Sequence, residues 1–338
     1  MITNKIKFNL IFIHLILFIF IFIFTFSEIT WAKSSGTTTA NFLKSEVGSR
    51  PVAMGGAFVA IADDINSLYY NPSGLVNIKG QEVTFMYNQA FMDSNYGFLA
   101  YGVNLKEKGS LGFSLTYAGI KDIKETNSLY PTGTGNIFSA QDLAISLSYA
   151  KKITSHLSFG NNLKLIRGNI EKESALGFAL DTGFLAKDIL NDNLSFGLAV
   201  LNLGSKMTYL NQKDKLPLTI KLGTSFKLLN DKLLLAIDIS KPIDNDLNIK
   251  SGFEYCLFNN FSLRGGYSTA SQDIGSQFTF GFGLKCSLIN LDLSYVPYGD
   301  LGNMIRISIS YSQNPLFKFS QVREDEDDQE GQDKNNFK

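Results

Sequence analysis

The amino-acid sequence predicts an all-β protein: a transmembrane antiparallel β-barrel of about 14 strands with an N-terminal plug or hatch segment. Three observations predict it. The chain begins with an export signal, and its later part alternates apolar and polar residues in short stretches. The connections between these stretches alternate between short and longer ones. After the export signal no apolar run is long enough to form a transmembrane helix.

The composition argues against several classes of function. The 31 basic and 31 acidic residues cancel, so the chain offers no electrostatic case for a nucleic-acid partner. Aromatic residues make up 13% and glycines number 29, which suits strands that face lipid and bend. Only two His and two Cys are present, too few for a His/Cys metal site or a histidine-based triad. We therefore expect no metal, no cofactor and no enzymatic activity.

Residues 1–32 have the pattern of a signal peptide. Lys5 and Lys7 precede the apolar run Leu10–Phe24, and small residues at Thr30 and Ala32 mark a cleavage site after Ala32. A retained anchor is the alternative, but the run is shorter than the roughly 20 residues that span a bilayer. No cysteine lies near the cleavage site, which excludes a lipoprotein signal.

Residues 33–78 are predicted to form the plug, in a structural or gating role. Its glycines allow positive φ and close backbone approach, and its prolines end regular structure. Arg50 is expected to pair with Asp63 or Asp64 inside the lumen; the two aspartates are expected to form a turn or cap, with a bound cation as the alternative. The loop lacks the lysine pattern of a phosphate-binding loop. The candidate site consists of Gly48, Arg50, Pro51, Met54, Gly55, Gly56, Asp63, Asp64, Tyr70, Asn71, Pro72 and Gly74.

Residues 79–313 are predicted to form the barrel. In Leu111–Ala118 and Ile305–Tyr311, large apolar residues alternate with Ser, Thr, Gly or Arg. A soluble sandwich also alternates, but its exposed face carries many Lys and Glu, whereas small polar residues suit a hydrated lumen. The expected strands are 82–92, 96–105, 110–120, 140–150, 156–168, 175–187, 193–204, 216–229, 232–240, 247–257, 260–270, 276–287, 288–296 and 303–312.

The connections support an even number of strands. Those after even-numbered strands are short, as in Lys106–Gly109 and Lys151–Ser155. Those after odd-numbered strands tend to be longer, as in Lys121–Ser139 and Ser205–Lys215, although the alternation is imperfect. This difference is typical of a barrel whose termini and short turns lie in the periplasm.

Few other residues could carry chemistry. His156, the one histidine after the signal peptide, lies at a predicted turn. Cys256 and Cys286 fall on strands that are not neighbours, which favours two separate cysteines over a disulfide. Charged residues expected on the lumen side could line a polar path or pair with one another, and pairing is the preferred interpretation. They are Lys164, Lys221, Asp238, Glu254 and Arg264.

Residues 314–338 form an acidic tail. Arg323–Lys338 is rich in Asp and Glu and poor in apolar residues, which predicts disorder in the periplasm. Recruitment of a basic partner or of Ca²⁺ is the alternative.

Several stretches resemble the PorV/PorQ family of outer-membrane proteins. Gly48–Ala60, Ala62–Asp64 and Tyr70–Leu75 are similar to the family's opening, and Val200–Gly204 and Leu263–Tyr267 to later parts. That family is similar to the long-chain fatty-acid transporter (FadL-like) barrels, which have fourteen strands and an N-terminal hatch. The resemblance implies a location in the outer membrane of a diderm bacterium, in contact with its lipid.

The resemblance leaves two functions open. In the first, the barrel is a carrier or scaffold of type IX secretion that binds exported proteins, passes them to a surface attachment complex, and uses loops such as Lys121–Ser139. In the second, it is a transporter that admits hydrophobic small molecules as the hatch shifts. A general porin is disfavoured because a plug would obstruct an open pore.

Overall fold

The computed structural model describes residues 36–89, 94–258, 260–269, 277–299 and 302–313. The chain divides into two compact units, Met1–Gly36 and Thr37–Lys338. Of the first unit only Gly36 is among the described residues, so the expected signal peptide lies outside them, as does the expected acidic tail.

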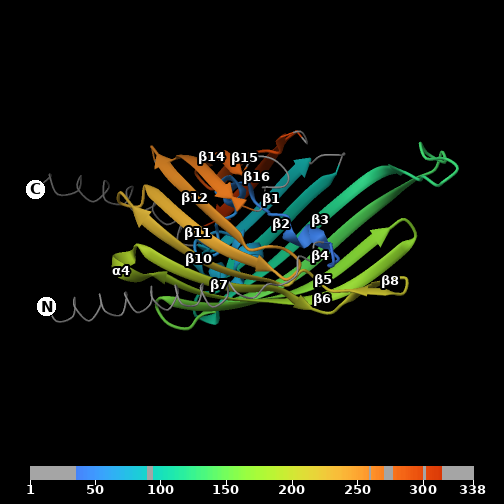
Figure 1. Ribbon diagram of the computed structural model, residues 1–338. Coiled ribbons are helices and arrows are strands. Elements are labelled where there is room, and N and C mark those ends of the chain that lie inside the picture. Colours follow the sequence, from blue (N-terminus) through green and yellow to red (C-terminus); the bar gives the residue numbers. More distant parts are fainter. Residues whose placement is uncertain (1–35, 90–93, 259, 270–276, 300–301, 314–338) are drawn as a thin grey trace, which may run out of the picture. The chain divides into compact units, whose positions relative to one another are not determined.

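The second unit is a β-barrel, as predicted (Figure 1). Within the described residues, fourteen antiparallel strands close when the first pairs with the last, with Gln81 opposite Gln313. The strands lie close to the predicted ranges. They are β1 (Gln81–Gln89), β2 (Asn95–Asn104), β3 (Ser110–Lys124), β4 (Ile137–Lys152), β5 (Leu157–Ile170), β6 (Glu173–Asp188), β7 (Leu194–Gly204), β10 (Thr219–Leu228), β11 (Leu233–Pro242), β12 (Asn248–Leu257), β13 (Phe261–Ser268), β14 (Phe278–Cys286), β15 (Ile289–Pro297) and β16 (Asn303–Gln313).

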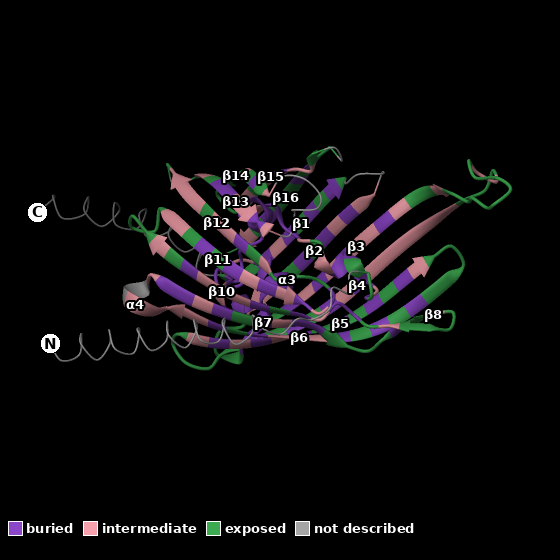
Figure 2. Ribbon diagram, viewed as in Figure 1, coloured by how far each residue is buried: buried purple, intermediate pink, exposed green. Residues whose placement is uncertain are grey.

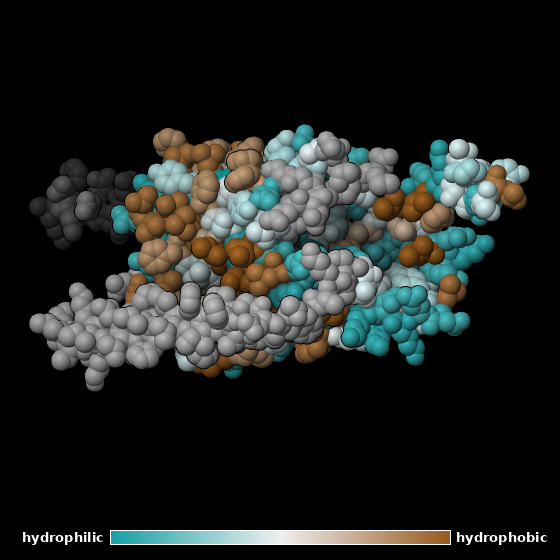
Figure 3. Space-filling view, viewed as in Figure 1, coloured by the Kyte–Doolittle hydropathy of each residue, from teal (hydrophilic) through white to brown (hydrophobic). Residues whose placement is uncertain are grey.

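Burial alternates along the strands of the wall (Figure 2). On β3, Ser114 and Thr116 are buried in the lumen, whereas Leu111 is exposed on the outside. The outer face gathers apolar side chains over β11 and β12, while polar ones gather at the end of the barrel near β6 and β8 (Figure 3). An apolar outer band around a polar lumen is the arrangement of a barrel in a bilayer.

The two ends of the barrel differ. Short turns, among them η3 (Lys106–Lys108) and α4 (Ile189–Asp192), lie at the end that holds Gln81 and Gln313. We call this the periplasmic end because short turns face the periplasm in such barrels, and the opposite end the outer end.

The outer connections differ from the prediction. The expected loop Lys121–Ser139 is wrong in extent, because β3 continues to Lys124 and β4 begins at Ile137, with an irregularity between Ile120 and Ile123. The expected loop Ser205–Lys215 contains a small hairpin, β8 (Met207–Tyr209) and β9 (Gln212–Asp214). The β3–β4 hairpin extends beyond β2, whose pairing with β3 ends at Gly119 (Figure 1).

The plug fills the lumen with short helical turns. They are η1 (Asn41–Lys44), α2 (Ser49–Ala53), α3 (Ser67–Tyr70) and η2 (Pro72–Asn77). Apolar side chains of the plug, among them Phe58, Leu68, Tyr70 and Leu75, are fully buried and form the main core with inward residues of the wall. Among the described residues, no helix is long and apolar enough to cross a membrane.

Candidate functional site

The plug is held by an ionic cluster around Arg50. Its Nη1 lies 2.6 Å from Asp63 Oδ1 and 2.8 Å from Asp64 Oδ2, so Arg50 contacts both aspartates where the sequence predicted one. Its Nε and Nη2 donate to the two carboxylate oxygens of Glu254 on β12, at 2.8 and 2.9 Å. This bidentate geometry is the strongest form of an arginine–carboxylate contact.

The wall extends this cluster. Arg264 on β13 donates from Nε to Glu254 at 2.6 Å and from Nη1 to Asp292 of β15 at 2.6 Å. The chain of alternating charges therefore runs from the plug through β12 and β13 to β15. Such a network fixes the plug against one side of the barrel.

The two aspartates differ in their surroundings. Burial by itself raises the pKa of Asp63, but the Arg50 guanidinium holds that pKa below its usual value. The pKa of Asp64 is raised, because burial outweighs its contact with Arg50. Asp64 Oδ1 also accepts from the Asn66 backbone N–H at 2.8 Å, which is a turn-forming contact. The described part of the chain holds no group of three His, Cys, Asp or Glu residues placed to bind a metal ion.

The first half of the plug motif forms α2 and the turn after it. Gly48, Gly55 and Gly56 all have positive φ. A Cβ on Gly55 would lie 2.7 Å from the Tyr267 carbonyl oxygen, so only glycine fits there. The Pro51 carbonyl accepts from Met54 and Gly56 and closes the turn; Met54 is fully buried against β12.

The second half surrounds Asn71. Its Nδ2 donates to the carbonyls of Val59, 2.9 Å away, and of Phe184 on β6, 3.1 Å away. Pro72 begins η2, and Gly74 packs against Ala62. The Tyr70 hydroxyl donates to the Val47 carbonyl at 2.9 Å. These side chains tie the plug's turns to one another and to the wall.

A belt of glycines on the inner face of the wall meets the plug. At each, an added Cβ would lie within 3.1 Å of a plug atom, and at Gly160, Gly197, Gly223, Gly252 and Gly266 that atom belongs to the plug backbone. The members of this glycine belt are Gly102, Gly112, Gly160, Gly183, Gly197, Gly223, Gly252, Gly266 and Gly281.

Of the five predicted lumen charges, Lys164, Glu254 and Arg264 form ion pairs, whereas Asp238 and Lys221 contact the plug. Lys164 lies 2.7 Å from Asp181 on the next strand. Asp238 of β11 accepts from the backbone N–H groups of Phe58 and Val59 at 2.7 and 2.9 Å. The Lys221 ammonium lies 5.2 Å from the centre of the Tyr70 ring.

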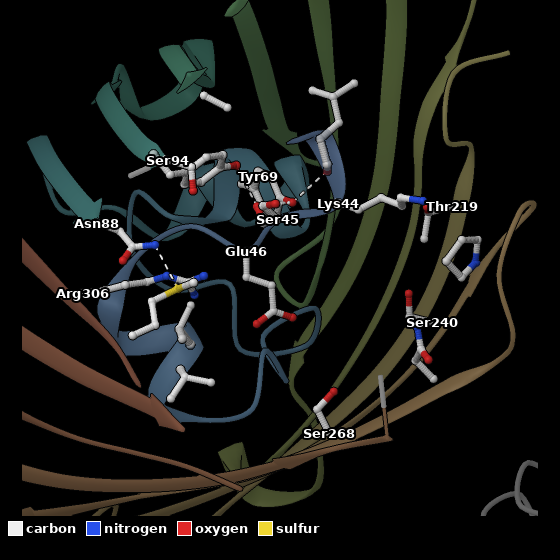
Figure 4. Close-up of a pocket in the computed structure, with 18 of the residues that line it drawn as sticks. Lys44, Ser45, Glu46, Tyr69, Asn88, Ser94, Thr219, Ser240, Ser268 and Arg306 are labelled. Carbon is white, nitrogen blue, oxygen red and sulfur yellow. Dashed lines mark hydrogen bonds between the residues drawn. The ribbon is translucent and has the colours of Figure 1, made fainter. Parts of the chain in front are cut away.

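Toward the outer end, the lumen holds a cavity of about 550 Å³ above the plug (Figure 4). Its lining includes Glu46 from the plug and Lys221, Lys250 and Arg306 from the wall. No local sequence pattern indicates this cavity, because Glu46, Lys250 and Arg306 are far apart in the chain. The inward positions of Lys250 and Arg306, read from the alternation along β12 and β16, were the available signal.

The two cysteines and His156, the other residues that could carry chemistry, do not form a site. Cys256 and Cys286 are both free, so the preferred interpretation of two separate cysteines is confirmed. His156 is exposed at the turn between β4 and β5, and its Nδ1 lies 3.2 Å from the Lys187 carbonyl oxygen.

These features define a class, the outer-membrane β-barrels whose lumen is closed by an N-terminal plug. Residues 30–244 match the family described as Type IX secretion system protein PorV. This match covers more than half of the chain, and the chain belongs to the PorV family. Of the later stretches that resemble the family, Val200–Gly204 lies within the matched region and Leu263–Tyr267 lies beyond it.

Solved structures support the fold. The toluene transporter TodX of Pseudomonas putida is 16% identical, with a TM-score of 0.58 over 79% of this chain and 98% of that one. The CymD monoaromatic hydrocarbon channel is 13% identical, with a TM-score of 0.59 over 79% and 97%. The Ralstonia pickettii toluene transporter TbuX is 13% identical, with a TM-score of 0.56 over 79% and 98%. At these identities the likeness shows the fold alone. The comparison with curated proteins gave no match.

Proposed function

We propose that this chain is a non-enzymatic carrier or scaffold of type IX protein secretion that binds exported proteins at the outer face of the outer membrane. The observation that carries the proposal is the fastened plug. The Arg50 cluster and the glycine belt hold the plug against the wall. Because a fixed plug closes the lumen, the proposed binding of exported proteins takes place at the outer surface.

The outer end offers a surface for protein binding. Leu129 and Tyr130, between β3 and β4, are 82% and 59% exposed, and Leu210, between β8 and β9, is 75% exposed. Apolar side chains on projecting hairpins outside the bilayer are a common feature of protein interaction sites. Exported proteins and the subunits of a surface attachment complex are the proposed partners.

The test is co-purification from native outer membranes in mild detergent, followed by mass spectrometry. The double variant Leu129→Ser/Tyr130→Ser is expected to retain several-fold less exported protein than the parent chain. The matched control is Ile153→Ser, since Ile153 is 57% exposed at the periplasmic end. Equal retention by the parent chain and the double variant would contradict the proposal.

A second candidate is a transporter of hydrophobic small molecules. Its support is the fold shared with TodX and TbuX. In the same purification, an apolar molecule bound without a stoichiometric protein partner would favour this candidate.

Export is proposed to use a cleavable signal peptide, residues 1–32, and the acidic residues 314–338 are proposed to remain in the periplasm. The plug then comprises residues 33–78 and the barrel residues 79–313.

A further inference from the structure

Two buried cations that line the cavity above the plug form no ion pair with the described residues. Lys44 pairs with Asp244 at 2.7 Å, and Lys250 pairs with Glu46. In the part of the chain that the structure describes, Lys221 and Arg306 form no ion pair, although they are only 8% and 5% exposed. A buried charge without a counter-ion is costly, so this arrangement favours a bound anion.

Arg306 lies in a row of three polar side chains on neighbouring strands. Asn88 of β1 and Ser294 of β15 are its direct cross-strand neighbours. Arg306 Nε, Asn88 Oδ1 and Ser294 Oγ are all buried and have no hydrogen-bond partner among the described residues. Buried polar atoms are seldom left unpaired, and three in one row indicate a place where a ligand or its bound water supplies the partners.

The charged side chains around the cavity point in directions that suit a bound ligand. Arg306 reaches from β16 toward the cavity, and Glu46 points into it from the plug (Figure 4). Lys221 lies over the rings of Tyr69 and Tyr70, with its Nζ 5.7 and 5.2 Å from the two ring centres. These aromatic faces support the cation without neutralising its charge.

We propose that this cavity is a binding site for a small hydrophilic anion, whose carboxylate or phosphate group is held by Arg306 and Lys221. A guanidinium and an ammonium are the donors that such groups prefer. Ser240, Ser268 and Asn248 also line the cavity and could hydrogen-bond a hydroxylated body. The volume of about 550 Å³ is typical of small-molecule sites.

The charges in the lining limit the ligand. Glu46 is neutralised by Lys250, but Asp142 of β4 also lines the cavity and forms no ion pair among the described residues. A ligand with one anionic group and a neutral body therefore fits better than a polyanion. The site is separate from the apolar hairpin tips and needs no exported protein.

Isothermal titration calorimetry on the purified full chain in a zwitterionic detergent tests the proposal. The probes are glucose 6-phosphate and inorganic phosphate, with glucose as the neutral control. Glucose 6-phosphate is expected to bind, and more weakly at high salt because screening reduces the attraction. Glucose alone is expected not to bind.

Two variants locate the site. Arg306→Gln and Lys221→Met are each expected to weaken glucose 6-phosphate binding at least tenfold. The control is Arg167→Gln, because Arg167 lies exposed on β5 outside the cavity. Because each site variant removes a buried unpaired charge, its melting temperature without ligand is expected to equal or exceed that of the parent chain.

Three results would overturn the proposal. They are the absence of binding by either phosphate probe to the parent chain, equal binding by Arg306→Gln, and a ligand-free melting temperature well below the parent for both site variants. The last would show that the two cations already have adequate partners.

Discussion

At the scale of single residues, Arg50 is the centre of the plug's attachment. It contacts Asp63 and Asp64 within the plug and Glu254 of the wall, and its side chain is 15% exposed. Removing one member of a buried ion cluster leaves the others without compensation, which is why the loss exceeds the worth of one surface pair.

We predict that Arg50→Met lowers the free energy of unfolding by about 3–5 kcal/mol, because three carboxylates lose their shared partner. Urea unfolding of the barrel in detergent micelles measures this. The control is Lys227→Met, which removes a pair with Asp188 at 2.8 Å whose side chains are 31% and 40% exposed. A loss of at most about 1 kcal/mol is expected there. Equal losses in both variants would contradict the role of Arg50.

Part of this cluster is predictable from the sequence. The short separation between Arg50 and Asp63 made their pairing predictable. The contact with Glu254 spans 204 positions and depends on which strand stands beside the plug, so no local pattern indicates it. The same reason hid Glu46 and Lys250, which are also 204 positions apart.

At the scale of elements, the glycine belt sets the fit between plug and wall. Gly197 of β7 is an example, since a Cβ there would collide with the carbonyl of Val59. A backbone cannot yield as a flexible side chain does, so the plug itself must move.

We predict that Gly197→Ala destabilises the barrel by about 1–3 kcal/mol and increases proteolysis of the plug. Limited proteolysis and urea unfolding of the purified protein are the measurements. Gly97→Ala is the matched control, because the nearest atom to a Cβ on Gly97 of β2 is the Met86 carbonyl oxygen, 3.9 Å away. A plug that stays equally protected in both variants would show that the belt does not hold it.

The strands were predictable, and their outer ends were not. Alternation is enforced where one face meets lipid and the other the lumen, so the wall could be read from the sequence. Beyond the bilayer both faces meet water, and the pattern fades. For that reason the ends of β3 and β4 were read as a loop, and the short β8–β9 hairpin was missed.

At the scale of the whole molecule, the start of the plug lies at the outer end. Thr38 hydrogen-bonds to Asp244, between β11 and β12, and forms a bridge with Lys215, before β10. Gln81 and Gln313, by contrast, lie at the periplasmic end. The chain therefore passes through the lumen, from outer end to periplasmic end, before the first strand begins.

We predict that an epitope inserted after Gly36 is labelled by antibody on intact cells. An epitope placed directly after Gln313 is expected to be labelled only when the outer membrane is permeabilised. Labelling in the reverse order would show that the assignment of the two ends is wrong.

The central claim is that the plug is a fixed part of a barrel that works at its outer surface, and a disulfide lock tests it most directly. Ser49 of α2 and Ser308 of β16 face one another, with 3.0 Å between their hydroxyl oxygens. The variant Ser49→Cys/Ser308→Cys, with Cys256 and Cys286 replaced by Ser, would join plug and wall. Exported protein bound in native membranes is then compared between the oxidised and reduced forms. The account predicts equal amounts. Loss of binding in the oxidised form, with recovery on reduction, would contradict it and show that the plug must move.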